Sequence, residues 1–306
     1  MSFIHYRIIL KLLSPLHIGK RKSRNLMETR EYVPGKTLWG ALTARITRDY
    51  FGSNPKIYEK VGNFLNENIR FGYLWPSLDG EKPYFPWKHN DFDYLFKFGY
   101  MGQPIDYNRK ATEEGELYEI EFIAPKTRHN KDVYLIGDLW VKELNYKSEI
   151  GIEKINFRKD DVILCLAKDE ISLKKVFDSI RLGGETGYGW GRVKVKYFRE
   201  DDNSKALGGI RAEIINDEVV LILEKGNHLT SHLLAADLSC QEFNFKILSE
   251  NFIQGSIEPF TGYAYTKEGW NIHQPFICFA PGSMVKTDII AKVSVFGLCQ
   301  LSMLKS

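Results

Sequence analysis

Residues suited to binding chemistry are concentrated in one glycine-rich segment. Five of the nine residues from 183 to 191 are glycine, and an alternating apolar and basic run follows directly. Glycine permits positive φ angles and the close approach of another backbone, so such a loop can present its N–H groups to an anion. Nucleotide-binding glycine motifs follow a strand and open a helix. This segment follows a helical pattern and precedes a strand, which excludes a Walker loop and a dinucleotide fingerprint.

Aromatic and cationic side chains accompany these glycines. The segment carries two aromatic residues between three glycines, with an arginine on each side: Tyr188, Trp190, Gly187, Gly189, Gly191, Arg181 and Arg192. Aromatic rings stack on unpaired bases, and guanidinium groups bind phosphates. The pattern therefore predicts an element that binds single-stranded RNA. A tight helix-to-strand connection, in which glycine relieves crowding and the rings join the core, accounts for the same residues.

Two further basic segments offer charges for phosphate groups. Residues 19–25, expected to form a loop, contain four cations within five positions: Lys20, Arg21, Lys22 and Arg24. Residues 126–131 form a weaker basic tip that includes Arg128. Lysine and arginine side chains that neutralise phosphates release counterions and so strengthen RNA binding. Solvated loops without a ligand would have the same composition.

His17 is the one candidate for catalysis. A histidine in a basic loop can act as the general base for RNA cleavage by a 2′-hydroxyl, although a lone histidine between apolar residues is more often structural. Glu28, Glu31 and Asp49 do not have the spacing of metal ligands, and no Ser–His–Asp, HExxH or paired-carboxylate motif is present. The sequence therefore predicts no metal site and no cofactor.

Regular elements flank these candidate residues. Residues 3–12 alternate as a strand, and Thr37 is a suitable N-cap for a helix that carries apolar residues at helical spacing. Three more strands are predicted at residues 117–125, 132–141 and 192–198. A second helix is predicted at residues 169–182. The order is β-α-β-β-α-β, which is typical of a ferredoxin-like, RRM-like α+β domain.

The chain is long enough for two modules. The first, residues 1–200, is expected to be the ferredoxin-like domain, with residues 50–116 as a long aromatic-rich insertion. Residues 201–209 have the composition of a linker. Strand patterns at 218–226, 242–248 and 277–296 predict a second, smaller sheet-based module over residues 210–306, a degenerate ferredoxin-like one.

Composition and charge limit the binding partners and the cellular compartment that can be expected for the protein. Its formal net charge is only +3, so any basic surface must be local. Four widely spaced cysteines lie among apolar residues and predict buried thiols in a reducing compartment: Cys165, Cys240, Cys278 and Cys299. Charged residues interrupt the apolar N-terminal run, and no cleavage site follows it. We therefore expect no signal peptide, no membrane span and a cytoplasmic location.

Three segments together resemble a known family. "SPLHIG", "REYVPGKTLWGAL" and "LGGETGYGWGRV" are similar to the N-terminal signature and the glycine-rich loop of the repeat-associated mysterious protein (RAMP) superfamily of CRISPR-Cas proteins. The resemblance covers residues 3–199. We expect His17, Lys36 and Trp39 near the same RNA-binding surface, although Trp39 suits the core equally well.

The last third of the chain narrows the resemblance. "EGWNIHQPFICFAPGSMV" looks like the second domain of the large type III capping subunits, most closely those of type III-D. Such subunits imply two RNA-recognition-like domains that hold the repeat-derived 5′ handle of the guide RNA. They contact the large polymerase-like subunit and abut the first backbone subunit. They are generally not nucleases.

Two departures separate the chain from related enzymes. Processing endonucleases of the superfamily carry the glycine loop close to the C-terminus, whereas more than a third of this chain follows Gly191. Backbone subunits carry a catalytic aspartate in the loop after the first strand, and the stretch from Gly19 to Pro34 contains only Glu28 and Glu31 as acidic residues.

The leading hypothesis is a non-catalytic RNA-binding subunit of a type III CRISPR effector complex. Its expected RNA-binding residues are Lys20, Arg21, Lys22, Arg24, Lys36, Arg181, Gly187, Tyr188, Gly189, Trp190, Gly191 and Arg192, with His17 and Arg128 close to the RNA. One alternative is a metal-independent endoribonuclease that processes repeat RNA with His17 as general base. The other is a structural adaptor without RNA contact.

Overall fold

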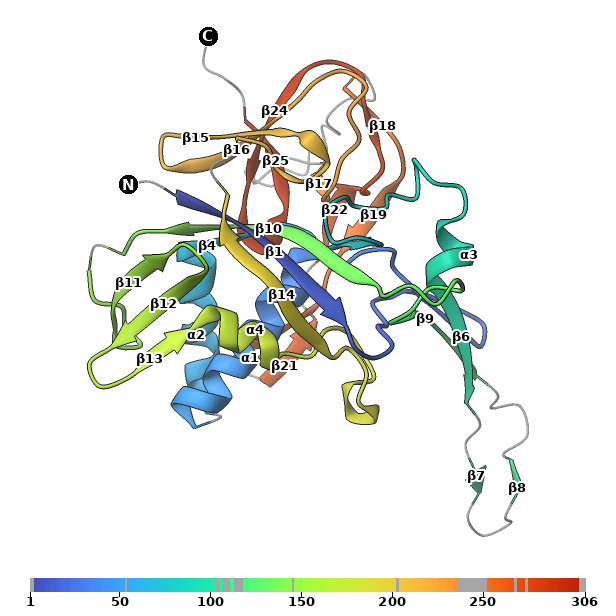
Figure 1. Cartoon of the computed structure of the whole chain (residues 1–306), viewed down its shortest axis with the longest axis horizontal. Helices are drawn as coiled ribbons and strands as arrows, with labels where there is room; N and C mark the ends of the chain where they lie inside the picture. The colour runs from blue at the N-terminus through green and yellow to red at the C-terminus, as the bar shows by residue number, and fades with distance from the viewer. Residues whose placement is uncertain are drawn as a thin grey trace.

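The chain is built around two large β-sheets, joined by residues 201–210 (Figure 1). The computed structural model describes residues 3–52, 54–102, 105–106, 111–112, 118–144, 146–201, 204–235, 252–266, 269–272 and 275–302. Within these residues, no helix is both long and apolar enough to cross a membrane.

The first large sheet has five strands in the order β14-β1-β10-β4, with β5 also paired to β10. β1 lies in the middle, antiparallel to both β10 and β14. The bounds are β1 (Phe3–Leu12), β4 (Ile69–Phe71), β5 (Trp75–Ser77), β10 (Tyr134–Lys142) and β14 (Val193–Glu200). With one helix after β1 and another before β14, this is the ferredoxin-like arrangement that the sequence predicts.

Helices cover one face of this sheet. They are α1 (Gly35–Phe51), α2 (Pro55–Asn68) and α4 (Leu173–Ser179), of which α1 packs on α2 and α4. Successive side chains of a strand point to opposite faces. Tyr6, Ile8 and Leu10 of β1 are therefore buried in the helix-side core, while Arg7 and Ile9 lie on the other face. That face is only partly covered.

A smaller, four-stranded sheet forms an arm beside the first sheet (Figure 1). Its order is β2-β3-β9-β6, with bounds β2 (Gly19–Ser23), β3 (Leu26–Thr29), β6 (Lys97–Gly102) and β9 (Tyr118–Ile123). The short helix α3 (Phe92–Phe96) leads into β6, and the pair β7 (Ile105–Asp106) and β8 (Ala111–Thr112) lies at the outer end of the arm. A three-stranded sheet of β11 (Ile152–Arg158), β12 (Asp161–Leu166) and β13 (Glu170–Ser172) precedes α4.

The second large sheet has seven strands in the order β15-β16-β24-β25-β17-β22-β19. Their bounds are β15 (Arg211–Ile215), β16 (Glu218–Leu223), β17 (Leu233–Leu234), β19 (Ile257–Phe260), β22 (Phe276–Phe279), β24 (Ile289–Val293) and β25 (Cys299–Leu301). Two small pairs accompany it, β18 (Ile253–Gln254) with β23 (Met284–Val285) and β20 (Tyr263–Thr266) with β21 (Gly269–Ile272). Most of its buried apolar residues form one cluster that also includes Phe3 of β1 and Trp140 of β10. The division into modules 1–200 and 210–306 stays a prediction.

Of the two predicted middle strands, the one at 132–141 is β10 of the first large sheet, but the assignment of the other was wrong. The strand predicted at 117–125 corresponds to β9 (Tyr118–Ile123), which belongs to the arm sheet. The second strand of the ferredoxin pattern is β4 with β5, inside the stretch expected to be an insertion. The helix α2 also lies in that stretch. Period-2 alternation predicts a strand but not its partner, because pairing depends on contacts with distant segments.

Three local expectations also need correction. Pro34, not Thr37, is the N-cap of α1, and the helix expected over 169–182 is limited to α4 by strand β13. The expected linker 201–209 is packed in its described part, because Ala206 and Leu207 are buried. The strand expected at 242–248 and Cys240 lie outside the described residues.

Candidate nucleic-acid interface

The glycine-rich loop is docked on the segment that follows β1. The Gly191 N–H donates to the carbonyl oxygen of Pro15 at 2.7 Å, and the Gly184 N–H donates to that of His17 at 2.9 Å. The Arg192 N–H donates to Ser14 Oγ at 2.9 Å. The structure thus joins two segments that are about 170 residues apart in the chain, "SPLHIG" and the glycine loop, in one site.

The glycines of the loop have two different roles. A Cβ on Gly183 would lie 2.2 Å from the His17 carbonyl oxygen, and one on Gly191 would lie 1.9 Å from that of Leu182; both residues have positive φ. These two glycines are required for docking. Gly187 and Gly189 at the tip have no atom within 4 Å of an added Cβ. Their backbone is therefore open to a ligand.

The two aromatic residues of the loop are in different environments. Tyr188 is 82% exposed, at the tip between the two open glycines. Trp190 is half-buried and makes edge contacts with Phe122 of β9 and Tyr100 of β6, with ring centroids 5.0 and 6.2 Å apart. Trp190 therefore connects the loop to the arm, while Tyr188 presents a free ring.

An aromatic stripe continues from Trp190 along the arm. Phe122 lies beside Phe98 with ring centroids 6.1 Å apart, and the Arg128 guanidinium lies 4.5 Å above the Phe98 ring and 5.2 Å from Tyr94. We define this stripe as Tyr94, Phe98, Tyr100, Phe122, Arg128 and Trp190. Arg128 thus lies at the far end of a stripe that leads to the loop, and its position near RNA stays a prediction.

Four members of the stripe were missed from the sequence: Tyr94, Phe98, Tyr100 and Phe122. Phe98 and Tyr100 are separated by one residue, which is the spacing of side chains on the same face of a strand. That signal was present. The pairing of β6 with β9 places Phe122 beside Phe98 and Tyr100, and the local sequence pattern does not predict this pairing.

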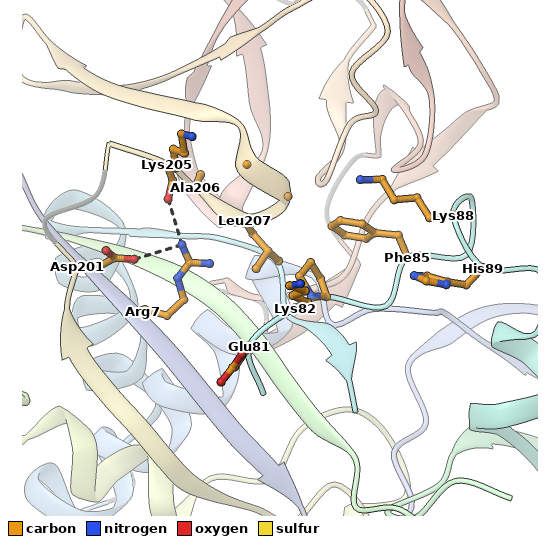
Figure 2. A pocket seen from close by; sticks show the side chains of 13 residues that line it. Arg7, Glu81, Lys82, Phe85, Lys88, His89, Asp201, Lys205, Ala206 and Leu207 are labelled. Carbon is orange, nitrogen blue, oxygen red and sulfur yellow. Dashed lines mark hydrogen bonds and ion pairs between the residues drawn. The ribbon is translucent and has the colours of Figure 1, made fainter. Parts of the chain in front are cut away.

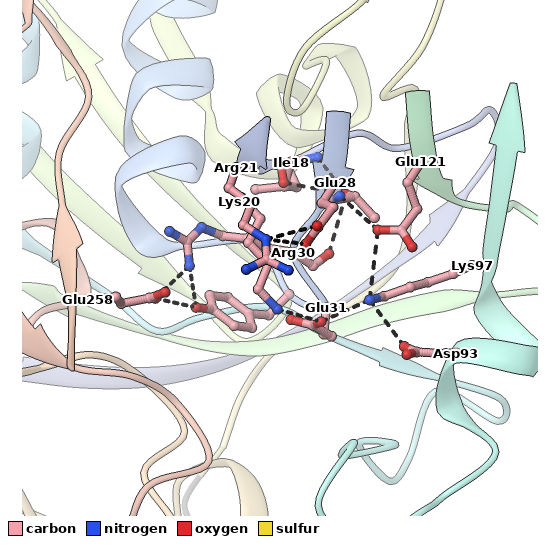
Figure 3. A network of polar contacts seen from close by, with 12 residues as sticks. Ile18, Lys20, Arg21, Glu28, Arg30, Glu31, Asp93, Lys97, Glu121 and Glu258 are labelled. Atoms are coloured by element: carbon pink, nitrogen blue, oxygen red, sulfur yellow. Dashed lines mark hydrogen bonds and ion pairs between the residues drawn. The ribbon is translucent and has the colours of Figure 1, made fainter. Parts of the chain in front are cut away.

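The basic segment 19–25 is a hairpin, not a loop. Its residues form β2 and the turn into β3, with Arg24 at positive φ in the turn. Lys20 Nζ lies 3.0 Å from Glu31 Oε1, and Arg21 Nε lies 2.8 Å from Glu28 (Figure 3). Lys22 and Arg24 are exposed and have no ion pair within the described part of the chain. Lys22 and Arg24 can therefore bind a ligand without first breaking an ion pair.

The acidic residues of this region belong to a structural network (Figure 3). Lys97 Nζ lies 2.9 Å from Glu31 and 3.8 Å from Glu121, and the Glu121 carboxylate accepts the Thr29 N–H at 2.9 Å. Burial opposes ionisation of Glu31, but Lys97 and Lys20 outweigh it and hold the pKa of Glu31 below its ordinary value. These contacts fasten β3 to β6 and β9.

His17 is positioned by the same arm. It is 8% exposed, and its Nδ1 lies 2.7 Å from the Glu121 carbonyl oxygen. A carbonyl oxygen only accepts hydrogen bonds, so Nδ1 carries the proton. The His17 carbonyl oxygen also accepts the Gly184 N–H. His17 therefore links the glycine loop to β9.

Lys36 is separated from the exposed cations. It is 8% exposed, and its Nζ has no hydrogen-bond partner among the described residues. Nζ lies 4.9 Å from the Phe296 ring, and the Lys36 side chain is against Gly262. Burial lowers the pKa of Lys36 to about 8. Segments of the second large sheet thus cover a residue that was expected at the RNA-binding surface.

Arg181 and Arg192 lie at the two ends of the loop. They are exposed and pair through an isolated antiparallel bridge, and one terminal nitrogen of Arg181 donates to the Thr186 carbonyl oxygen at 2.7 Å. The site therefore combines Tyr188, the open backbone at Gly187 and Gly189, and exposed cations on both sides. Within the described residues, no group of three or more His, Cys, Asp or Glu could hold a metal ion.

Three of the solved structures that match this chain are of the type III-B Cmr-beta. A chain in a cryo-EM structure of the type III-B Cmr-beta bound to cognate target RNA and AMPPnP has a TM-score of 0.48 and 15% identity, over 92% of this chain and 86% of that chain. The corresponding structure bound to cognate target RNA has the same values. In the apo state, a chain has a TM-score of 0.35 and 12% identity, over 63% of this chain and 97% of that chain.

The family assignment rests on a separate comparison. No curated protein matches the sequence. The family profile described as RAMP superfamily matches residues 9–194, a range that includes the end of β1, the strands of the arm and the docked glycine loop. This match covers more than half of the 306 residues. The chain therefore belongs to the RAMP superfamily.

Proposed function

We propose that this protein is a non-catalytic RNA-binding subunit of a type III CRISPR effector complex. The observation that carries the proposal is the glycine loop. It presents a ring that is 82% exposed, Tyr188, between two glycines with open backbone, beside an aromatic stripe. Bases of single-stranded RNA stack on such rings, and their phosphates need close backbone approach and nearby cations.

The same arrangement suggests how RNA would bind. Phosphates would lie against Lys22 and Arg24 of the hairpin and Arg181 and Arg192 of the loop, which are exposed. Lys20 and Arg21 can exchange their carboxylate partners for phosphate, because surface ion pairs contribute only about 0–1 kcal/mol. An unstacked base would lie on Tyr188.

The specific RNA and partners follow from the resemblance of the sequence motifs. We propose that the RNA is the repeat-derived 5′ handle of the guide RNA, and that the protein caps the backbone filament as in type III-D-like complexes. Its protein partners would be the large polymerase-like subunit and a backbone subunit. A cytoplasmic location belongs to the same proposal.

The endoribonuclease alternative lacks a supporting observation. Its general base would be His17, which is 8% exposed and donates its Nδ1 proton to a backbone carbonyl. These contacts support a positioning role. A structural adaptor without RNA contact is not favoured either, because it gives no reason for the free ring of Tyr188.

A binding titration tests the proposal. Purified full-length protein is titrated with labelled single-stranded repeat RNA in EDTA, and bound, free and cleaved RNA are resolved on native and denaturing gels. Tyr188→Ala should weaken binding by about 1–3 kcal/mol. Replacing both Lys22 and Arg24 with alanine should make the negative slope of log K against log salt less steep by about 1–2.

The matched control is Lys56→Ala, a change at an exposed lysine of α2 on the helix side of the fold. It should leave affinity and salt slope unchanged. Site-specific cleavage would support the nuclease alternative, and equal affinity of wild type and Tyr188→Ala would contradict the proposed site.

A further inference from the structure

A groove runs across the face of the first sheet that the helices leave uncovered. One hollow, of 590 Å³, lies between residues 81–89 and residues 205–209 (Figure 2). A second hollow, of 650 Å³, lies over β1, β10 and β14. Arg7, Glu81 and Asp201 line both hollows, so the two are continuous. We call this feature the sheet-face groove; neither the glycine loop nor the aromatic stripe contributes a lining residue.

Arg7 lies at the junction and is held rigidly. Its Nε is 3.1 Å from Asp138 Oδ1, and its Nη2 is 3.3 Å from Asp201 and 3.0 Å from the Lys205 carbonyl oxygen. Asp138 is itself 2% exposed and accepts the Leu207 N–H at 2.7 Å. The guanidinium is therefore oriented before any ligand arrives.

One terminal nitrogen of Arg7, Nη1, has no partner within the described residues. In Figure 2 a nitrogen of Arg7 extends toward Leu207 and Lys82, into the first hollow. The exposed lysines Lys82, Lys88 and Lys205 line the same hollow. Oriented guanidinium groups and nearby lysines are the usual protein ligands of phosphate.

The second hollow has a different lining. Tyr134 of β10 and Tyr197 of β14 lie on either side of Ile9 of β1, since Tyr197 is paired with Ile9 and Tyr134 with the β1 residue two positions later. Tyr197 is 37% exposed. Rings on an open sheet face of this kind stack on nucleobases. This hollow therefore suits a planar base.

Glu81 lies between the two compartments. It is exposed, and its backbone is fixed because Asp79 Oδ1 accepts the N–H groups of Glu81 and Lys82 at 2.8 and 3.0 Å. A carboxylate in this position can accept hydrogen bonds from ribose hydroxyls. A phosphate compartment, a carboxylate and an aromatic compartment thus follow one another along the groove.

We propose that the sheet-face groove binds a nucleoside phosphate. The phosphate lies at Arg7 with Lys82 and Lys205, and the base lies against Tyr134 and Tyr197. The ligand is either a free mononucleotide or the terminal nucleotide of an RNA strand, which share this chemistry. The groove and the glycine loop have no residue in common, so failure of either proposal leaves the other standing.

Direct binding measurements test the groove. Full-length protein is titrated calorimetrically with AMP, GMP, CMP and UMP, and separately with adenosine and inorganic phosphate. The same protein is photocrosslinked to azido-AMP and to short RNAs whose terminal nucleotide carries an azido base, with or without a 5′-phosphate. Crosslinked peptides are identified by mass spectrometry. Unfolding midpoints are recorded for every variant.

The variants separate the two compartments. The double variant Lys82→Glu/Lys205→Glu should weaken nucleotide binding about 10-fold or more, because hydrogen bonds to charged groups contribute about 1.5–3 kcal/mol. Tyr197→Ala should weaken it by about 10-fold through lost stacking. The control Lys56→Glu makes one lysine-to-glutamate change, on α2, and should have no effect.

Each outcome decides the proposal. Mononucleotide binding that both groove variants weaken supports it with a free nucleotide as ligand. Crosslinking of only the RNA terminus to peptides containing Tyr134 or Tyr197 supports it with RNA as the source. Inorganic phosphate that binds as tightly as the nucleotides would overturn it, as would the absence of both nucleotide binding at millimolar concentration and crosslinks in the groove.

Discussion

The buried ammonium group of Lys36 has no hydrogen-bond partner among the described residues. An unpaired buried polar group costs about 1–3 kcal/mol in proteins. Lys36→Met, which keeps the length of the side chain without the charge, should therefore increase the free energy of unfolding by about that amount at pH 7. Urea denaturation of the two proteins measures the difference.

The pH dependence provides a second readout for this residue. The folded-state pKa of about 8 lies below the ordinary 10.5, so the unfolded chain binds more protons between these values. Wild-type stability should rise relative to Lys36→Met as the pH increases from about 8 toward 10.5. A constant difference between the two proteins across this window would show that the ammonium group is solvated.

At the scale of an element, the docked glycine loop is expected to contribute to the stability of the fold. Gly191→Ala introduces a Cβ 1.9 Å from the Leu182 carbonyl oxygen at a residue with a φ of +73°, so the loop must shift from Pro15. The free energy of unfolding should fall by about 1–3 kcal/mol. Chemical denaturation measures it.

Gly187→Ala is the matched control within the same element. No atom lies within 4 Å of its added Cβ, and its φ is outside the positive region, so stability should change by less than about 0.5 kcal/mol. Equal losses for the two variants would mean that the docking of Gly191 does not contribute to stability.

A polar network connects the two large sheets at the scale of the whole molecule. His232 Nε2 lies 2.5 Å from Glu258 Oε1, and one terminal nitrogen of Arg30 lies 2.6 Å from the same oxygen. His232 Nδ1 is 2.6 Å from the Tyr73 hydroxyl. Burial opposes ionisation of Glu258, but His232 and Arg30 outweigh it and lower its pKa to about 2. Burial also lowers the pKa of His232.

Acid should therefore loosen the contact between the sheets. The unfolded chain takes up a proton at His232 first, below about pH 6.5, and at Glu258 as the pH falls from about 4.5 toward 2. Stability should decline over both ranges. Glu258→Gln should cost about 3–5 kcal/mol at pH 7, because it leaves Arg30 without its carboxylate, and should flatten the decline below pH 4.5.

Denaturant midpoints measured from pH 7.5 down to about pH 2 follow this effect. The control is Glu59→Gln, at an exposed glutamate of α2, which should follow the wild-type curve. If Glu258→Gln and wild type decline in parallel below pH 4.5, the acid sensitivity has another source.

The sequence by itself determined the features that depend on neighbouring residues. Alternation over residues 3–12 predicted β1, helical spacing predicted α1, and the glycine content of residues 183–191 identified a special loop. Short motifs also predicted the RAMP superfamily, which the family match confirms. These signals are local, because strand and helix periods and the φ freedom of glycine are properties of short stretches.

The tertiary structure alone decided which distant segments meet. β9 joined the arm instead of the central sheet, Glu28 and Glu31 paired with Arg21 and Lys20, and the segment around Gly262 covered Lys36. Strand partners and ion-pair partners far apart in the chain are selected by the packing of the whole core, and no local pattern encodes that choice. The docking of the glycine loop on Pro15 and His17, on which the proposed RNA site depends, is a contact of this kind.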